Sequence, residues 1–386
     1  MSNEDNTLAS NPQLAARCFV PERIDAVGWG NNVPQRTQNR FRIEPQDFDS
    51  IVSTNKLVWS EMMVNLLKEK NPEFTNITVQ KLTTTSSSDG TPLIIILMDN
   101  EYECRVVSEI IDLCDDQQLA LIVHVITQNL QLFVHASVSK PGSTLIKKII
   151  QKLNNSSISM LKIIIRSLCD GFYEIMTDRN GSYIIAHCLG LLDADQTQPI
   201  YEAAIRHCLS LATNKRGCIS LNNFIVGARG RYRDQLLNLI CDNAVSLSQD
   251  ESGNYVVQKV LSLECPDFTN KISLILRGRY ASLSMQKVGS HVVEQIIMKS
   301  SLGMRIAVND LLGMRSSATD KNLLLQVTKN RYGNYVIQRA LKVTKQVDGE
   351  LHRQLLWSLQ PYFEELEDGG YGKNVYNLIV NGVPID

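Results

Sequence analysis

The sequence contains no apolar run long enough to cross a membrane. Its longest run, Leu93–Met98, has six residues, whereas a membrane-spanning helix needs about 20. The first ten residues, MSNEDNTLAS, lack the basic and apolar regions of a secretory leader. We therefore expect a soluble, cytoplasmic chain that makes no membrane contact.

Motifs of catalysis and metal binding are also absent. There is no glycine loop of the phosphate-binding type, no HExxH and no GxSxG, so the sequence favours no enzyme class. The nine cysteines are an odd number without a CxxC pair, which indicates reduced core thiols rather than disulfides. The pairs His187/Cys188 and His207/Cys208 lack zinc-ligand spacing. We expect no catalytic residue, no cofactor and no metal.

Net charge is nearly absent too, at −1 over 386 residues, and phosphate contacts need Lys and Arg. The average hides an uneven distribution. Residues 211–345 hold 19 Lys and Arg against 9 Asp and Glu, whereas the counts are 18 against 24 over 1–210 and 2 against 7 over 346–386. The basic block indicates either a polyanion-binding surface or a solvated helical face.

One nine-residue pattern recurs inside this basic block, as GNYVVQKVL, GSHVVEQII and GNYVIQRAL. If its glycine is position zero, apolar residues lie at −6, +3, +4, +7 and +8, and the last four form one side of an α-helix. Copies with zero at eight positions follow one another at steps of 36 to 44 residues: Glu103, Gly142, Gly181, Gly217, Gly253, Gly289, Gly333 and Gly372. Because such a helix buries its apolar side only against neighbours, the repeats predict an all-α solenoid of about eight units.

The chain divides into a tail and a repeat domain. Residues 1–45 are rich in Asn, Gln, Pro and Arg without periodicity, which predicts a disordered polar tail. Residues 46–386 form the repeat domain, with clear copies from about residue 97 and a terminal cap from about residue 360. Residues 57–70 predict an amphipathic helix, and 83–92 predict a turn-rich connector. A match at Asn76–Gln80 copies only the polar residues, as a degenerate or accidental repeat.

Positions +1, +2 and +5 lie together on one side of the predicted helix. Two amides can donate to and accept from the edge of uracil, whereas a hydroxyl with a carboxylate suits the donor groups of guanine. An aromatic ring at +2 offers a face on which an unstacked base can lie. Three copies are candidate one-base pockets: Asn254, Tyr255 and Gln258; Ser290, His291 and Glu294; Asn334, Tyr335 and Gln338. A HEAT-like or armadillo-like solenoid that binds peptide would fit the same polar residues.

The pattern and its polar positions resemble the Pumilio (PUF) family of RNA-binding proteins over about residues 97–380. The 44-residue step before Gly333 and the segment YGKNVYNLI are similar to that family's last repeat and cap. The resemblance implies a crescent of three-helix repeats whose concave surface binds single-stranded RNA antiparallel to the protein. It also implies a UGU core, with a 5′ uracil on Asn334/Gln338, guanine on Ser290/Glu294 and the next uracil on Asn254/Gln258.

The upstream copies depart from the family's pattern. Ala186 cannot hydrogen-bond a base, and Lys147 and Ser108 match no familiar pair. We therefore expect relaxed recognition of the 3′ part of the site, with Lys147 near a phosphate and Tyr183 or Arg105 stacking on bases. The upstream candidates are Cys218, Ile219 and Asn222; Ser182, Tyr183 and Ala186; Ser143, Thr144 and Lys147; Cys104, Arg105 and Ser108. Lys373 and Asn377 belong to the expected cap, where we predict no base pocket.

The sequence thus predicts a monomer that binds a UGU element of mRNA, in the 3′ untranslated region. It would regulate translation or mRNA stability, with protein co-regulators on its convex face. The alternative is a divergent helical-repeat scaffold that binds protein partners, or that acts in ribosomal RNA processing with relaxed RNA specificity.

Overall fold

The computed structural model describes residues 56–313 and 322–382, so the predicted tail over 1–45 lies outside the described residues. Within these ranges the regular structure is helical, apart from an isolated bridge between Ser86 and Pro92, and the predicted all-α class is confirmed. No single helix of the described residues is long and apolar enough to span a membrane. The successive helices Asp116–Thr127 and Leu130–Val138 pass that test only when taken together.

Two compact units make up the chain, and the first ends at Ile126. From residue 56 on, it contains α3 (Lys56–Lys68), α4 (Pro72–Thr84), α5 (Leu93–Asp99), α6 (Cys104–Leu113) and α7 (Asp116–Thr127). α3 packs against α6, and α4 packs against α5. The helix predicted over 57–70 is α3, and the predicted connector is a turn that begins after Thr84.

The second unit, residues 127–386, repeats the predicted three-helix plan. Short first helices carry the apolar residue at −6: α8 (Leu130–Val138), α11 (Phe172–Met176), α16 (Ala244–Gln249), α19 (Tyr280–Ser284), α22 (Leu323–Lys329) and α25 (Phe363–Glu367), the last preceded by η1 (Gln360–Tyr362). Before Gly217 the end of α13 takes the place of the first helix, because that helix extends through Leu211.

Second helices begin at or near position zero: α9 (Lys140–Ser156), α12 (Arg179–Leu191), α14 (Gly217–Gly227), α17 (Gly253–Ser262), α20 (Gly289–Lys299), α23 (Gly333–Val347) and α26 (Gly372–Val380). Third helices complete the repeats: α10 (Ile158–Asp170), α13 (Ala194–Ala212), α15 (Gly230–Asp242), α18 (Pro266–Ile275), α21 (Ser301–Leu311) and α24 (Gly349–Leu359).

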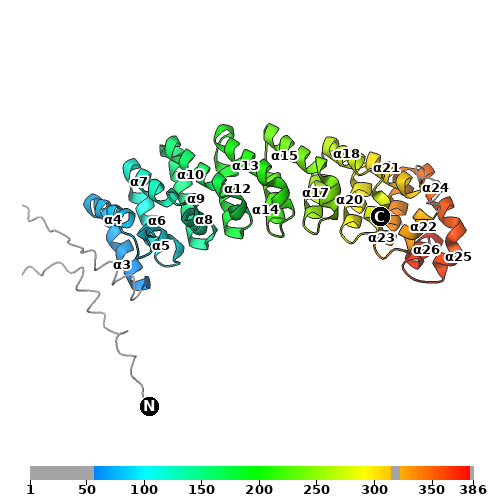
Figure 1. Cartoon of the computed structure of the whole chain (residues 1–386), viewed down its shortest axis with the longest axis horizontal. Helices are drawn as coiled ribbons and strands as arrows, with labels where there is room; N and C mark the ends of the chain where they lie inside the picture. The colour runs from blue at the N-terminus through cyan, green and yellow to red at the C-terminus, as the bar shows by residue number, and fades with distance from the viewer. Residues whose placement is uncertain (1–55, 314–321, 383–386) are drawn as a thin grey trace, which may run out of the picture. The chain divides into compact units, whose positions relative to one another are not determined.

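Like helices of this unit lie side by side. Each second helix packs against the next one from α9 to α26, and the third helices form a second row from α10 to α18 and on to α21. Figure 1 shows the third helices along its upper edge and the second helices below them. In α17 the residues at +3, +4, +7 and +8 are completely buried, so the apolar side predicted from the pattern forms the core between repeats.

Position zero is glycine because the second helix begins against the backbone of residue −6. A Cβ atom on Gly333 would lie 2.3 Å from the carbonyl oxygen of Val327. The corresponding distance is 2.5 Å for Gly181 and 2.8 Å for Gly289. A larger side chain would force these backbones apart in a close-packed interior. This close approach explains why the glycine and the apolar residue at −6 recur together.

Glu103 is the exception at position zero, and it lies in the first unit. Its side chain is completely buried, and its carboxylate lies 3.4 Å from Nζ of Lys56 on α3. Burial raises the pKa of the Glu103 carboxyl, and the nearby Lys56 ammonium opposes that shift. A neighbouring cation therefore accompanies the only charged residue that occupies this position among the eight copies.

A side chain at −3 caps the start of the second helix in six of the eight copies. In α17, the carboxylate of Asp250 accepts hydrogen bonds from the backbone N–H groups of Ser252 at 2.8 Å and Gly253 at 2.7 Å. Such a cap satisfies donors that the first helical turn leaves unpaired. The residues concerned are Asn100, Ser139, Asp178, Asn214, Asp250 and Asn330.

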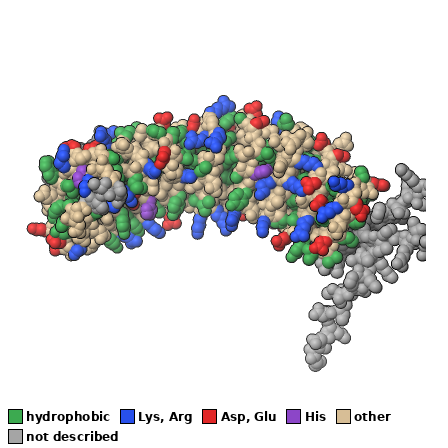
Figure 2. All heavy atoms as spheres, turned by 180° about the vertical axis from the view of Figure 1, so that it is seen from behind, with side chains coloured by type: hydrophobic (Ala, Val, Ile, Leu, Met, Phe, Trp, Pro, Cys, Tyr) green, Lys and Arg blue, Asp and Glu red, His purple; other side chains and the backbone are tan. Residues whose placement is uncertain are grey.

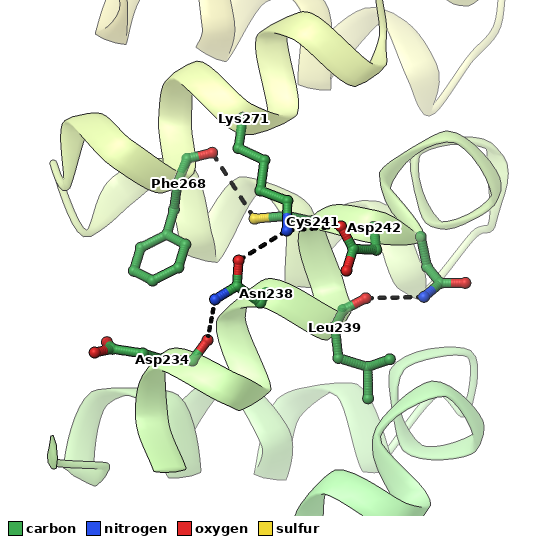
Figure 3. A network of polar contacts seen from close by, with 8 residues as sticks. Asp234, Asn238, Leu239, Cys241, Asp242, Phe268 and Lys271 are labelled. Carbon is green, nitrogen blue, oxygen red and sulfur yellow. Dashed lines mark hydrogen bonds and ion pairs between the residues drawn. The ribbon is translucent and has the colours of Figure 1, made fainter. Parts of the chain in front are cut away.

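Polar contacts also join successive third helices. Lys271 points from α18 toward α15, where its Nζ donates to Oδ1 of Asn238 at 2.7 Å and lies 2.7 Å from Oδ1 of Asp242 (Figure 3). Beside it, Sγ of Cys241 contacts the carbonyl oxygen of Phe268 at 3.8 Å. These contacts help to set the spacing of neighbouring repeats, and with it the spacing of the second helices.

Candidate nucleic-acid interface

The side chains at +2 form an exposed row along the second helices. Tyr183, Ile219, Tyr255 and Tyr335 are 51, 61, 59 and 56% exposed, and the His291 side chain is 63% exposed. Their helices, α12, α14, α17, α20 and α23, pack against one another in that order. One ring or apolar side chain per repeat, open to solvent, is an arrangement suited to stacking successive unstacked bases.

The side chains at +1 instead turn back onto their own helix. In seven of the eight copies the side chain at +1 donates a hydrogen bond to the carbonyl oxygen three residues earlier: Cys104, Ser143, Ser182, Cys218, Asn254, Ser290 and Asn334. Asn254, Ser290 and Asn334 are at most 3% exposed. This contact explains why the residue at +1 is short and carries a donor in these seven copies.

The amides at +1 and +5 pair with each other in two repeats. The amide nitrogen of Asn254 donates to the carbonyl oxygens of Asp250 and Glu251, both at 2.9 Å, and its Oδ1 accepts from Nε2 of Gln258 at 2.9 Å. Asn334 and Gln338 repeat this arrangement. The buried Asn thus orients the half-buried Gln. Binding of a uracil edge by both amides requires Gln to turn away from Asn.

The carboxylate at +5 of α20 lies between two basic side chains. Oε1 of Glu294 lies 3.9 Å from Nδ1 of His291 on the same helix, and Oε2 lies 3.9 Å from Nε of Arg339 on α23. Burial raises the pKa of Glu294, and His291 and Arg339 act in the opposite direction. Ser290, the partner at +1, donates to the carbonyl oxygen of Lys287 at 3.2 Å. An ionised carboxylate here can accept two donors of a guanine edge.

A groove of about 840 Å³ separates α12 from α14. Tyr183 and Ile219 line it, together with Ala186, whose side chain offers no hydrogen-bonding group at +5. In the next pocket, Nδ2 of Asn222 donates to the carbonyl oxygen of Tyr255 at 3.4 Å, while its Oδ1 is buried without a hydrogen bond. The groove can hold a base by shape and stacking, whereas reading its edge needs a polar group at +5.

The remaining upstream residues are unlike a pocket for a uracil or a guanine. Lys147 on α9 is half-buried near His187 of α12, whose pKa is lowered by burial and by Lys147. In the first unit Arg105 is exposed, and burial raises the pKa of the Cys104 thiol. At the other end of the chain, Lys373 and Asn377 are exposed on α26. Their assignments remain predictions.

A row of cations at −2 was not among the sequence predictions. Five copies have Lys or Arg there, all exposed at the start of second helices: Lys140, Arg179, Lys215, Lys287 and Arg331. Figure 2 shows basic side chains projecting from the lower edge of the middle of the molecule, away from the third helices. Cations beside a row of stacking side chains are suited to the phosphates of a single strand. Counting charges at −2 alone would have revealed the row.

The cysteines and acidic groups form no metal site in residues 56–313 and 322–382, where no group of three or more possible ligands comes together. Cys188, Cys208 and Cys241 are buried, which raises the pKa of each thiol to about 12. Such thiols remain protonated and unreactive near neutral pH. Their contribution is to packing.

Comparisons with known proteins match most of the chain to one family. Residues 94–316 match the model of the NOP9-like PUF repeat domain, and residues 324–347 match the Pumilio-family RNA binding repeat. Pumilio homolog 18 of Arabidopsis thaliana is 32% identical over 272 residues, which are 70% of this chain and 80% of that protein. Pumilio homolog 12 of the same plant is 32% identical over 73% of this chain, but the match spans only 46% of its own length.

Solved structures agree with the fold. The Puf4 RNA binding domain bound to an HO endonuclease RNA 3′ UTR recognition sequence superposes with a TM-score of 0.61, at 22% identity, over 79% of this chain and 95% of that one. The RNA-binding domain of yeast Puf5p bound to SMX2 RNA gives a TM-score of 0.58 at 19% identity, over 79% and 92%. At these identities the likeness shows a shared α-solenoid fold.

Proposed function

The chain belongs to the Pumilio family of RNA-binding repeat proteins, and from that premise we propose that it recognises UGU in single-stranded RNA. The target would be a 3′ untranslated region, and binding would regulate the translation or stability of the mRNA. The proposal describes a binding protein without catalytic activity. It acts as a cytoplasmic monomer, and the side chains exposed on its third helices, such as Leu274 and Trp357, are available to protein co-regulators.

The observation that carries the proposal is the order of three neighbouring pockets. Along α23, α20 and α17 the residues at +5 are Gln338, Glu294 and Gln258, each half-buried beneath an exposed ring at +2. An amide, a carboxylate and an amide match the edges of uracil, guanine and uracil in that order. The RNA-bound state named for the Puf4 and Puf5p structures supports single-stranded RNA as the ligand.

Fluorescence polarisation with RNAs of 8 to 10 nucleotides tests this proposal. We expect an RNA that contains UGU to bind at least about fivefold more tightly than the same RNA with UAU, because a mismatched contact of this kind costs roughly 1–3 kcal/mol. A scrambled RNA of equal composition serves as the control at matched salt. Equal affinity for all three RNAs would contradict the proposal.

A second function, RNA binding with relaxed specificity, is favoured by one observation. The part that matches the NOP9-like model includes the copies in which Ala186 and Lys147 replace an edge-reading residue. Ribosomal RNA processing or a scaffold role would suit such a protein. Selection of bound sequences from a random RNA pool separates the two functions, because relaxed binding would enrich no UGU.

A further inference from the structure

Glu294 meets a charged residue of the following repeat. Arg339 is at +6 of α23, its side chain is 34% exposed, and its Nε lies 3.9 Å from Oε2 of Glu294, which is 19% exposed. α20 and α23 pack directly against each other, so this approach is part of the interface between the two repeats. The polar residues of the Ser290 repeat are therefore in contact with a side chain of the next repeat, Arg339.

The register of the repeats indicates which residue of the following repeat lies beside each side chain at +5. A residue at +6 of one repeat lies beside the residue at +5 of the preceding one, as His187 does with Lys147. By the same register Gln295 of α20 lies beside Gln258 of α17. The Gln258 amide thus lies beside another amide, whereas the Glu294 carboxylate lies beside the cation of Arg339.

We propose that Arg339 is a positioning residue for the pocket of the preceding repeat, where it holds the Glu294 carboxylate ready for a guanine edge. Base choice at this site is then set by two repeats together. The inference rests on the proposed function, and it adds a residue outside positions +1, +2 and +5. Arg339 acts through Glu294 and does not itself contact the base.

The charges around Glu294 explain how the residue would act. Among the described residues, His291 on its own helix and Arg339 on α23 are the charged or titratable groups that contact the carboxylate. The other helices packed against α20, among them α17, α19 and α21, place no charged group within ion-pair distance of it. Burial favours the protonated carboxyl, which accepts fewer hydrogen bonds. A nearby guanidinium offsets that effect.

The experiment measures the ratio of affinities for UGU and UAU RNAs as a function of pH, in the full chain. Arg339→Gln should lower the ratio at pH 7 at least about twofold, the lower end of coupling between residues in contact. Loss of the cation raises the pKa of Glu294 further, so the pH at which guanine preference is half lost should move upward. Arg339→Lys should restore most of the affinity ratio and most of the pH midpoint, because it keeps the positive charge.

Lys259→Gln is the matched control. Lys259 occupies +6 of α17, and by register it faces Asn222 rather than a carboxylate. If Arg339 served only to attract phosphates, both variants would weaken the two RNAs equally, and that result would overturn the inference. An unchanged ratio and pH midpoint in Arg339→Gln would overturn it as well. Absence of guanine preference in the wild type would instead remove the proposed function and this inference together.

Discussion

Nε2 of Gln338 donates a hydrogen bond of 3.0 Å to Oδ1 of Asn334, whose own amide nitrogen donates to two backbone carbonyl groups. Asn334 is completely buried, so its orientation is fixed by the start of the helix. The residue at +1 thus has two roles, because it closes the first turn of α23 and orients the Gln that the solvent reaches. If the proposed function holds, stability and base recognition are linked at this position.

Replacement of Asn334 should therefore affect both properties. We expect Asn334→Ala to lower the free energy of unfolding by about 1–2 kcal/mol, because two backbone carbonyls lose a donor, and to weaken uracil preference at the first base. Asn334→Ser should recover most of the stability, since Ser290 makes the same contact to the carbonyl three residues earlier. Asn334→Ser should not recover the preference for uracil at the first base. Urea denaturation and fluorescence polarisation measure the two effects.

Gln338→Ala is the comparison for that series. It keeps the bonds of Asn334 to the backbone and removes only the donor to Oδ1 of Asn334, so the free energy of unfolding should fall by less than in Asn334→Ala while uracil preference falls. If Gln338→Ala were as destabilising as Asn334→Ala, the separation of roles would be wrong.

Two substitutions give the candidate pocket on α20 the Asn and Gln that α17 and α23 have at +1 and +5. Ser290→Asn with Glu294→Gln should move preference at the second base from guanine to uracil by about 1–3 kcal/mol. Affinities for UGU and UUU RNAs, measured for wild type and double variant, give the shift directly. An unchanged order of affinities would remove the pocket assignment.

The exposed ring at +2 should contribute equally to the affinity for RNAs of any sequence. Tyr255→Ala should weaken binding by about 1–3 kcal/mol for any RNA, because stacking does not depend on the base edge. The side chain is 59% exposed, so thermal unfolding should be nearly unchanged. No loss of affinity would mean that the ring does not stack on the RNA.

The cations at −2 should contribute a salt-dependent part of the affinity. Lys287→Ala with Arg331→Ala should reduce the slope of log Kd against log salt by about 1.4, because each phosphate contact on a single strand contributes about 0.7. Base preference should stay the same. The control removes two cations from third helices, Arg166→Ala with Arg353→Ala, and should leave the slope unchanged. Equal slopes in all three proteins would contradict the phosphate role.

Much of the fold was predictable because the same spacing recurs eight times. The apolar pattern located the second helices, and glycine at zero with an apolar residue at −6 reflects the contact of Gly333 with Val327. The caps at −3 were also present in the sequence, as in Asp250. The apolar pattern does not reveal them, because the capping residue at −3 is polar and varies among Asn, Asp and Ser.

The helices that carry the candidate residues could be predicted from the sequence, but the contacts of their side chains could not. The polar positions lie on the second helices, where stacking side chains such as Tyr335 are exposed. The pattern could not show that Asn254 is buried and bound to its own helix, since an Asn suits both a helix cap and a base edge. The approach of Arg339 to Glu294 joins different repeats, and it depends on how adjacent helices pack.

Lys56 and Glu103 should make the stability of the first unit depend on pH. A carboxyl whose pKa is raised by folding binds its proton more tightly in the folded chain, so its burial costs stability at high pH, and the cost fades as pH falls through the raised pKa. Lys56→Met removes the opposing cation. We expect it to destabilise the unit by roughly 1–3 kcal/mol at pH 8 and by less at pH 5. Hydrogen exchange of the α6 amides, corrected for intrinsic rates, reports this local stability.

The control combines Lys56→Met with Glu103→Gln. Its stability should differ little between the two pH values, because no buried carboxyl remains. An equal loss of stability at both pH values in Lys56→Met alone would show that Lys56 acts only by packing.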